Sequence, residues 1–313
     1  MDPTTNPKDL YRLLAVGSSE EVLSEVLEIL ERISSDFNTE PILNVFDAAQ
    51  RLYGGNFPGY RASNTGYHDL RHAIEAFLAM CRLIHGALLS SQSFSERQII
   101  TALIAAILHD VGYIQEASDT RGTGAKYKAV HEQRSMDFLS HHGFEFGLSD
   151  DEIAAGRMII QCTDMDTDIT AIAFPSAQIE LLGKLLGTAD LMAQLAEQTY
   201  LEKLLYLYYE CEEAGVGEYE GEVDILRKAV NFYDVFEERL RTTLGGVDRF
   251  MQLHFASRWG IHQDLYHEAI SKQKDYLLKI LSIPDSDPRD YLKQGGIVKK
   301  VHQIHHKNPP KHH

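Results

Sequence analysis

The chain has 313 residues, of which 44% are hydrophobic and 24% are charged. This composition is typical of a folded globular protein with one large or two modest domains, and it excludes disorder over most of the chain. With 30 basic and 46 acidic residues the net charge is −16, which makes nucleic acid or an anionic membrane a poor partner.

Apolar segments and cysteines indicate the cellular compartment. No uncharged apolar stretch approaches the ~20 residues that a membrane span needs, and the first residues, MDPTTNPKDL, lack the apolar segment of a leader peptide. Cys81, Cys162 and Cys211 lie far apart in apolar surroundings, as small buried thiols do in a reducing compartment. The sequence therefore predicts a soluble cytoplasmic protein without disulfides.

The acidic charge is concentrated in the body of the protein. Residues 297–313 contain four Lys, five His and no acidic residue, so residues 1–296 carry 26 basic and 46 acidic side chains, a net charge of −20. A body of this sign needs local positive charge to handle an anionic substrate. A bound metal ion is a compact way to supply it.

Helix signals dominate the chain from the N-terminus onward. Serine followed three residues later by glutamate or glutamine predicts a helix start at Ser18, Ser95 and Ser149. Apolar residues at helical intervals predict further helices over residues 67–89, 130–141, 175–209, 223–244 and 262–281. Glycine-rich turns stand between these segments, and no comparable run alternates apolar and polar residues. The predicted fold class is all-α.

One compact multi-helix domain is expected, because no linker long enough to separate two domains interrupts the pattern. Residues 1–60 are predicted to form a helical extension packed on a core of residues 61–210. Residues 211–282 would complete the domain with C-terminal helices. The helical period is lost after Ile283, so residues 283–313 are expected to form a loosely ordered basic tail.

Histidines and aspartates recur at positions that predict chemistry. His68 and His72 are four residues apart and would share one helix face. His109 and Asp110 end residues 99–108, a run that is apolar nearly all round and so predicts a buried helix. Burying an ionisable pair is costly unless something compensates the charge. A divalent cation would do so, because imidazole nitrogen and carboxylate oxygen are its ordinary ligands.

Two further residues extend this series. His131 begins another predicted helix, and Asp190 is a lone carboxylate in an apolar helical pattern. A single buried polar residue usually has an ordinary hydrogen-bond partner. The ordered set on successive helices instead predicts a site for one or two divalent ions, closed on the protein side and open to water on the other. Zinc, iron, manganese, nickel and magnesium all accept such ligands.

The same residues carry a resemblance to a known family. The motifs are Tyr67-His68 with His72-Ala73, then Ala106-Ile107-Leu108-His109-Asp110, Thr163-Asp164-Met165 and Ala189-Asp190-Leu191. In this order they resemble the HD superfamily of metal-dependent phosphohydrolases, and within it the catalytic domain of cyclic nucleotide phosphodiesterases. The resemblance covers residues 60–210.

The resemblance implies a role for each matching residue. His72, His109, Asp110 and Asp190 would hold the first metal, with Asp110 also reaching a second that His131 supports. His68 would donate a proton to the leaving oxygen. Two ions would neutralise the phosphate and acidify a bridging water, whose hydroxide attacks phosphorus in line.

Substrate contacts follow from the same resemblance. Tyr67, Thr163 and Met165 would line the pocket, and Gln252 with Phe255 would hold a purine base. Three basic residues in the loop before His131 are candidates for phosphate contact, namely Arg121, Lys126 and Lys128. The chain departs from the family at Tyr113 and Ala193, where those phosphodiesterases have histidine and asparagine. These two differences affect the part of the resemblance that implies contacts to a second metal and to the substrate.

The expected activity is metal-dependent hydrolysis of a phosphate ester in a small nucleotide-like substrate, with a cyclic nucleotide favoured. A nucleotide phosphomonoesterase would use the same site. A di-iron oxygenase is a weaker alternative, because such sites use a further histidine where this chain has Gln161-Cys162. A binding module with a relic pocket is the non-enzymatic alternative. The tyrosines at 200, 206, 208 and 209 predict core packing, or a homodimer interface if part of them is exposed.

Overall fold

The structure, a computed structural model, describes residues 13–14 and 17–305, and regular structure in this part of the chain is helical apart from one isolated antiparallel bridge between Tyr60 and Glu116. The predicted all-α fold is confirmed. The α-helices of the described residues are α2 (Ser19–Ile33), α3 (Glu40–Tyr53), α4 (Leu70–Leu89), α5 (Glu96–Leu108), α6 (His131–His142), α7 (Asp150–Gln161), α8 (Ala177–Ala196), α9 (Tyr200–Ala214), α10 (Glu222–Arg241), α11 (Arg249–Trp259), α12 (Leu265–Leu281) and α13 (Ile297–His305).

Three helices begin where the sequence predicts. Ser18, Ser95 and Ser149 are the N-caps of α2, α5 and α7, and each accepts a hydrogen bond from the backbone N–H three residues on. The side chain of that third residue accepts in return from the N–H of the serine. Two of the N–H groups that lack a partner within the helix are thereby satisfied, so local chemistry alone defines these boundaries.

Helix α4 lies at the centre of the larger group of helices and packs against α2, α5, α8 and α11. Among the described residues it is the one helix long and apolar enough to cross a membrane, but 83% of its apolar window is buried inside the protein. Helix α5 is buried from Ile99 to Leu108 on all sides. These two helices form the middle of the hydrophobic core, and they carry His72 and His109 at their ends.

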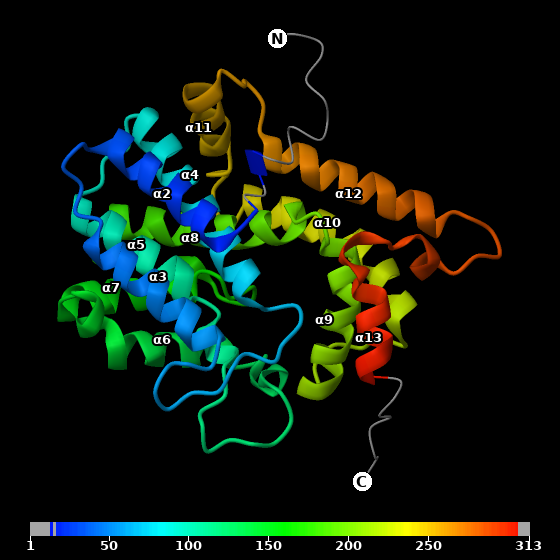
Figure 1. Ribbon diagram of the computed structural model, residues 1–313. Helices are drawn as coiled ribbons and strands as arrows, with labels where there is room; N and C mark the ends of the chain where they lie inside the picture. Colours follow the sequence, from blue (N-terminus) through cyan, green and yellow to red (C-terminus); the bar gives the residue numbers. More distant parts are fainter. Residues whose placement is uncertain (1–12, 15–16, 306–313) are drawn as a thin grey trace.

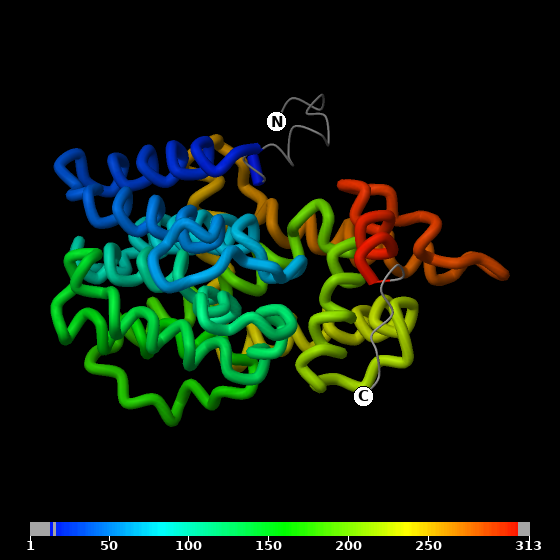
Figure 2. The backbone as a smooth tube through the Cα atoms, turned by 60° about the horizontal axis from the view of Figure 1, so that its bottom comes forward, coloured from blue at the N-terminus to red at the C-terminus, as the bar shows by residue number. Residues whose placement is uncertain are grey.

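The helices form two groups (Figure 1). Helices α2 to α8 and α11 gather on one side, and α9, α10, α12 and α13 on the other. Figure 2 shows the same division from another direction, with α2 and α3 (blue) far from α13 (red). The two groups are joined through α8, which packs against α4 on one side and α12 on the other.

The single helix predicted over residues 175–209 is two helices, because the chain breaks between α8 and α9 at residues 197–199. The carbonyls of Glu197 and Gln198 accept hydrogen bonds from Gln273 Nε2 of α12, at 2.9 and 3.2 Å. The Glu197 carboxylate accepts from Lys203 Nζ at 3.0 Å. These partners are distant in sequence or lie across the break, so apolar periodicity does not reveal it.

The tail is more ordered than the sequence predicts within its described part, residues 283–305. Two 3₁₀ turns, Pro288–Tyr291 and Gln294–Gly296, lead into α13, which packs on α9. Ile297 and Val301 are buried there, and the ring of His305 stacks on Tyr209 at 3.6 Å between centroids. Helix α13 thus covers part of the tyrosine-rich face of α9. Residues 306–313 of the predicted tail lie outside the described residues.

A buried histidine pair joins α4 to α11. The Nδ1 atoms of His85 and His254 are 3.0 Å apart, and His254 is completely buried. Burial, assisted by the positive charge of Arg82, lowers the pKa of His254 to about 2. His254 therefore stays neutral in the folded protein, whereas a histidine in the unfolded chain titrates near pH 6.5.

Replacing His254 with glutamine should make the protein less sensitive to acid. As the pH falls below about 6.5, the unfolded chain takes up a proton at this position and the folded protein does not, so wild-type stability is lost, by up to about 2 kcal/mol at pH 5. The His254→Gln variant should lack this loss. Urea unfolding at pH 7.5 and 5.0 measures it, with His141→Gln on the exposed face of α6 as control. Equal pH dependence in wild type and His254→Gln would contradict the assignment.

Candidate functional site

Four side chains converge at the junction of three core helices. His72 lies in the first turn of α4, His109 and Asp110 follow the end of α5, and Asp190 lies in α8. His72 Nε2 is 3.0 Å from Asp190 Oδ1, 3.3 Å from His109 Nε2 and 3.4 Å from Asp110 Oδ2. His109 Nε2 is 3.4 Å from Asp190 Oδ1 and 3.5 Å from Asp110 Oδ2. The sequence-predicted set is therefore brought together.

This geometry fits a divalent cation. Ligand bonds of ~2.0–2.2 Å in tetrahedral or octahedral arrangement place neighbouring donor atoms about 3.0–3.5 Å apart, and the Nε2 atom of each histidine lies at this spacing from the other histidine and from both carboxylates. Asp110 Oδ2 is buried without a hydrogen-bond partner. His109 Nδ1 donates to the carbonyl of Ala106 at 2.8 Å, which leaves the lone pair of Nε2 directed at the cluster. His72, His109 and Asp110 alone already form a potential metal-binding group.

The electrostatics of the cluster favour a positive charge at its centre. Burial by itself lowers the pKa of His109, but the carboxylates of Asp110 and Asp190 outweigh burial and raise it to about 10. In the same way the pKa of His72 is raised against burial by Asp190 and Asp110. Two buried carboxylates thus require compensation at this point, which protons on the imidazoles or a divalent cation can provide.

Asp110 faces a second group through its other oxygen. His131 Nε2, at the start of α6, is 3.5 Å from Asp110 Oδ1. His131 Nδ1 donates to the carbonyl of Lys128 at 2.7 Å, so Nε2 is the lone-pair nitrogen. Burial, with the nearby carboxylates, raises the pKa of the adjacent Glu132 to about 7. Asp110 therefore faces, through Oδ1, the histidine that the resemblance assigns to a second ion.

A close backbone approach holds His131 beside Asp110. A Cβ atom on Gly112 would lie 1.9 Å from the carbonyl oxygen of His131, so only glycine permits α6 to begin here. The Gly112 N–H donates to Ser135 Oγ at 2.9 Å, and its carbonyl accepts from Arg134 Nε at 2.7 Å. The segment after the His-Asp pair is thereby fixed to the first turn of α6.

The start of α4 is fixed by Asp69. Its Oδ1 caps the helix by accepting from the N–H of His72 at 3.0 Å and also accepts from Lys203 Nζ of α9 at 3.2 Å. Lys203 is buried and pairs with Glu197 as well. One carboxylate therefore orients the first turn of α4, which carries His72, and connects it to the second group of helices.

His68 lies beside the cluster, with its ring centroid 6.2 Å from that of His72 and 6.1 Å from that of His131. Its Nδ1 donates to Glu210 Oε2 of α9 at 2.7 Å, and Glu210 Oε1 accepts from the N–H of Tyr67 at 2.7 Å. Burial, followed by the positive charge of Lys128, lowers the pKa of His68 well below its usual value. Glu210 thus fixes the tautomer and orientation of His68. No motif in the sequence indicated Glu210.

Tyr113, a departure from the resembled family, is part of the site. Its ring stacks on His68, at 4.2 Å between centroids, and on His131, at 4.3 Å. Its hydroxyl is 3.5 Å from His68 Nε2. Tyr113 thus packs on both imidazoles, whose rings are tilted by 40° to each other, and this positioning role was not predicted. Ala193, the other departure, is buried in α8.

A cleft of about 880 Å³ opens beside the cluster. Its wall includes the predicted residues Tyr67, His68, Asp110, His131, Thr163, Met165 and Asp190, and also Lys128. Arg239 of α10 supports the turn at residues 163–165 from below. Its NH1 donates to the carbonyl of Met165 at 2.7 Å and its NH2 to that of Asp164 at 2.6 Å. No motif in the chain indicated Arg239.

Gln252 and Phe255, the residues predicted to bind a purine base, lie outside the cleft. Phe255 is completely buried in the contact of α11 with α4, where its ring stacks on Trp259 and lies near the Arg82 guanidinium. Gln252 is exposed and donates to the carbonyl of His262 at 2.8 Å. Neither residue lines the cleft. The purine-clamp prediction is corrected: apolar packing, not a ligand, places Phe255.

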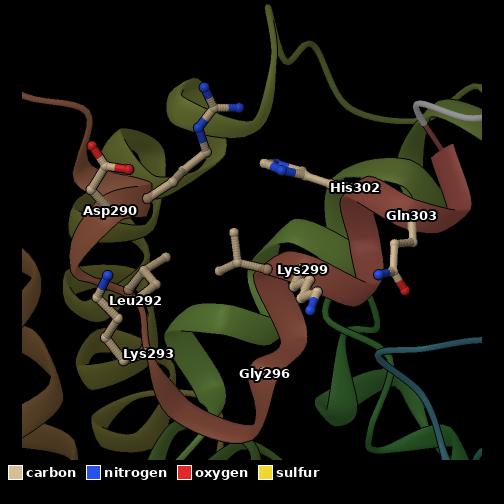
Figure 3. A pocket seen from close by; sticks show the side chains of 9 residues that line it. Asp290, Leu292, Lys293, Gly296, Lys299, His302 and Gln303 are labelled. Atoms are coloured by element: carbon tan, nitrogen blue, oxygen red, sulfur yellow. The ribbon is translucent and has the colours of Figure 1, made fainter.

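A second hollow, of about 520 Å³, lies between α13 and the segment before it (Figure 3). Its labelled side chains include Asp290, Lys293, Lys299 and His302. The charge of Arg289, which also lines it, is already neutralised by Asp287 at 2.6 Å and Glu222 at 2.5 Å. The hollow shares no lining residue with the cleft beside the His-Asp cluster, so the cleft is the candidate site.

The family of the chain follows from comparison with known families. A family described as Npun_R2479-like matches residues 57–241, more than half of the chain. The chain belongs to this family. The matched span includes the ligand cluster, His68 and Glu210, and it ends before Gln252 and Phe255. A search of curated proteins gave no match.

Removing Asp190 should abolish metal binding. Protein loaded with Zn²⁺ or Mn²⁺ and freed of excess ion should retain metal, and chelation should lower its Tm because ion binding stabilises only the folded state, by about 4 kcal/mol at a thousand times Kd. Asp190→Ala should retain little metal and show no chelator effect. Inductively coupled plasma mass spectrometry and thermal unfolding measure both. Asp234→Ala, an exposed carboxylate of α10, is the control. Unchanged metal content in Asp190→Ala would refute the cluster as a metal site.

Proposed function

We propose that this protein is a metal-dependent phosphohydrolase that cleaves a phosphate ester, with a phosphodiester as the favoured substrate. One observation carries the proposal. The Nε2 atoms of His72 and His109 lie 3.0–3.5 Å from each other and from the carboxylates of Asp110 and Asp190, beside an open cleft that a carboxylate-oriented histidine also lines. The ordered motifs that resemble HD-superfamily phosphohydrolases support the same reaction class.

Different residues of the site would hold the cations and attract the substrate. His72, His109, Asp110 and Asp190 would hold a first cation, and Asp110 Oδ1 with His131 Nε2 would face a second. Bound there, divalent cations supply charge neutralisation for the phosphate and an acidified water as nucleophile. Lys128 lines the cleft and would attract an anionic substrate into an otherwise acidic protein.

His68 would deliver the proton to the leaving oxygen. Its Nδ1–H is committed to Glu210, so Nε2 is the atom that exchanges a proton with the substrate. In the protein without substrate, His68 is neutral because burial lowers its pKa. A phosphate anion entering the cleft acts in the opposite direction and favours protonation of Nε2. Glu210 stabilises the resulting imidazolium, as a buried carboxylate does for a catalytic histidine.

A panel of four phosphate esters distinguishes the proposed phosphodiesterase from the alternative, a nucleotide phosphomonoesterase. Bis(4-nitrophenyl) phosphate, 4-nitrophenyl phosphate, cyclic AMP and AMP should be offered to the protein loaded with Zn²⁺, Mn²⁺ or Mg²⁺. Diester hydrolysis that disappears on chelation and in Asp110→Asn is the expected result. Hydrolysis of monoesters alone would instead favour the nucleotide phosphomonoesterase. Bound metal without hydrolysis of any ester would refute the proposal. Without the Gln252 and Phe255 clamp, cyclic AMP is one substrate among several.

His68→Ala should retain metal and lose on the order of 10²–10⁴ in rate on a diester with a poor leaving group. The loss should be much smaller for 4-nitrophenyl esters, whose leaving group needs no proton. Glu210→Gln keeps an acceptor for His68 Nδ1 but removes the charge, so it should show a smaller loss with the same leaving-group dependence. Steady-state kinetics measures both, with Glu212→Gln on the exposed face of α9 as control. Equal losses on the two leaving groups would exclude the acid role.

A further inference from the structure

The cleft continues from the metal-ligating cluster into an apolar region that the proposed chemistry does not use. Helices α8, α9 and α10 supply this outer half of the cleft, with Leu191, Leu204, Leu207, Ile225, Phe232 and Val235 in its wall. The two halves form one continuous hollow of about 880 Å³. Cavities that bury a drug-sized organic ligand measure about 300–1,000 Å³. A phosphate group fills a small part of that space, so the outer half is available to the organic part of the substrate.

Exposed apolar side chains mark the mouth of this region. Val235 is 52% exposed and Met165 is 37% exposed, and both line the cleft. Val130, 49% exposed, immediately precedes the lining residue His131. Large apolar side chains exposed around a hollow indicate a surface that becomes covered on binding. An apolar group entering beside them would remove their surface from water.

The polar groups of the outer half do not form a base-reading set. The amide side chains that line the cleft within the described part of the chain are those of Gln194 and Asn231. Lys228 pairs with Asp224 at 3.0 Å and lies over the ring of Tyr219. Its charge is already partnered within α10. Recognition in this half therefore comes from apolar contact.

We propose that the outer half of the cleft binds an apolar alcohol portion of the substrate, so that the physiological substrate is a phosphate ester of an alkyl or aryl alcohol. This rests on the proposed function, which assigns the phosphate to the metal-ligating half. The phosphate would lie between Asp110 and His68, and the organic group would extend between α9 and α10 toward Val235. Apolar burial, which scales with the area removed from water, would select the substrate.

A series of alkyl 4-nitrophenyl phosphates tests this on the Mn²⁺-loaded protein. The alkyl group is methyl, butyl or hexyl and the reaction is constant: water oxygen bonds to phosphorus, the bond to 4-nitrophenolate breaks, and alkyl phosphate and a proton are released. If the alkyl group enters the outer half, kcat/KM should rise about two- to fourfold per methylene. A flat series would overturn the proposal while leaving phosphate ester hydrolysis intact.

A matched pair of variants locates the effect. Phe232→Ala removes a half-buried ring from the wall, so its loss of kcat/KM should grow with chain length and be largest for the hexyl ester. Phe144→Ala removes a 60% exposed phenylalanine outside the cleft and should behave as wild type. An equal loss by Phe232→Ala on all three esters would count against the proposal, because it would indicate a general structural effect.

Measuring ligand binding in the absence of hydrolysis distinguishes the proposed apolar subsite from the proposed phosphohydrolase reaction. Isothermal titration with methylphosphonate and hexylphosphonate, which cannot be hydrolysed, should give a Kd that is lower for the hexyl compound by at least tenfold. That result together with no hydrolysis of any ester would refute the proposed reaction but retain the apolar subsite. Equal affinity for both compounds would overturn the subsite. Tighter binding of cyclic AMP than of hexylphosphonate would also overturn it, in favour of a nucleotide.

Discussion

The structure depends on compensating buried charge at the end of its most apolar helix. Helix α5 delivers His109 and Asp110 into the core, where both are almost fully buried. Asp110 has one oxygen without a hydrogen-bond partner, and that oxygen points at two imidazole nitrogens. A buried carboxylate in such surroundings is unstable without a partner charge. The helices around α5 are arranged so that three imidazoles and a second carboxylate surround it.

The scaffold around the cluster is rigid for identifiable reasons. Gly112 permits contact of the His-Asp segment with the start of α6, Asp69 caps α4 at His72, and the ring of Tyr113 packs on two histidines. Each contact fixes one ligand-bearing element relative to another. A site built on helix termini held in this way keeps its donor atoms at ligand spacing, which a site on free loops would not.

The second group of helices contributes residues to the candidate site beyond the His-Asp cluster. Helix α9 contributes Glu210 to His68 and Lys203 to Asp69, and α10 contributes Arg239 beneath the turn at Met165. The same two helices form the apolar wall of the cleft. The residues that would position the ion and those that would select the substrate therefore belong to different parts of the fold and meet only in the cleft.

Local signals in the sequence determined the helix starts at Ser18, Ser95 and Ser149 and the all-α class, because caps and apolar periodicity involve neighbours in the chain. They also indicated the ligand residues, since a charged pair ending an apolar helix is costly wherever that helix packs. The break between α8 and α9 and the partners Glu210 and Arg239 were decided by the tertiary structure alone. The same is true of the burial of Phe255 away from the site. Each depends on a contact between segments far apart in the chain, whose geometry exists only after the helices have packed.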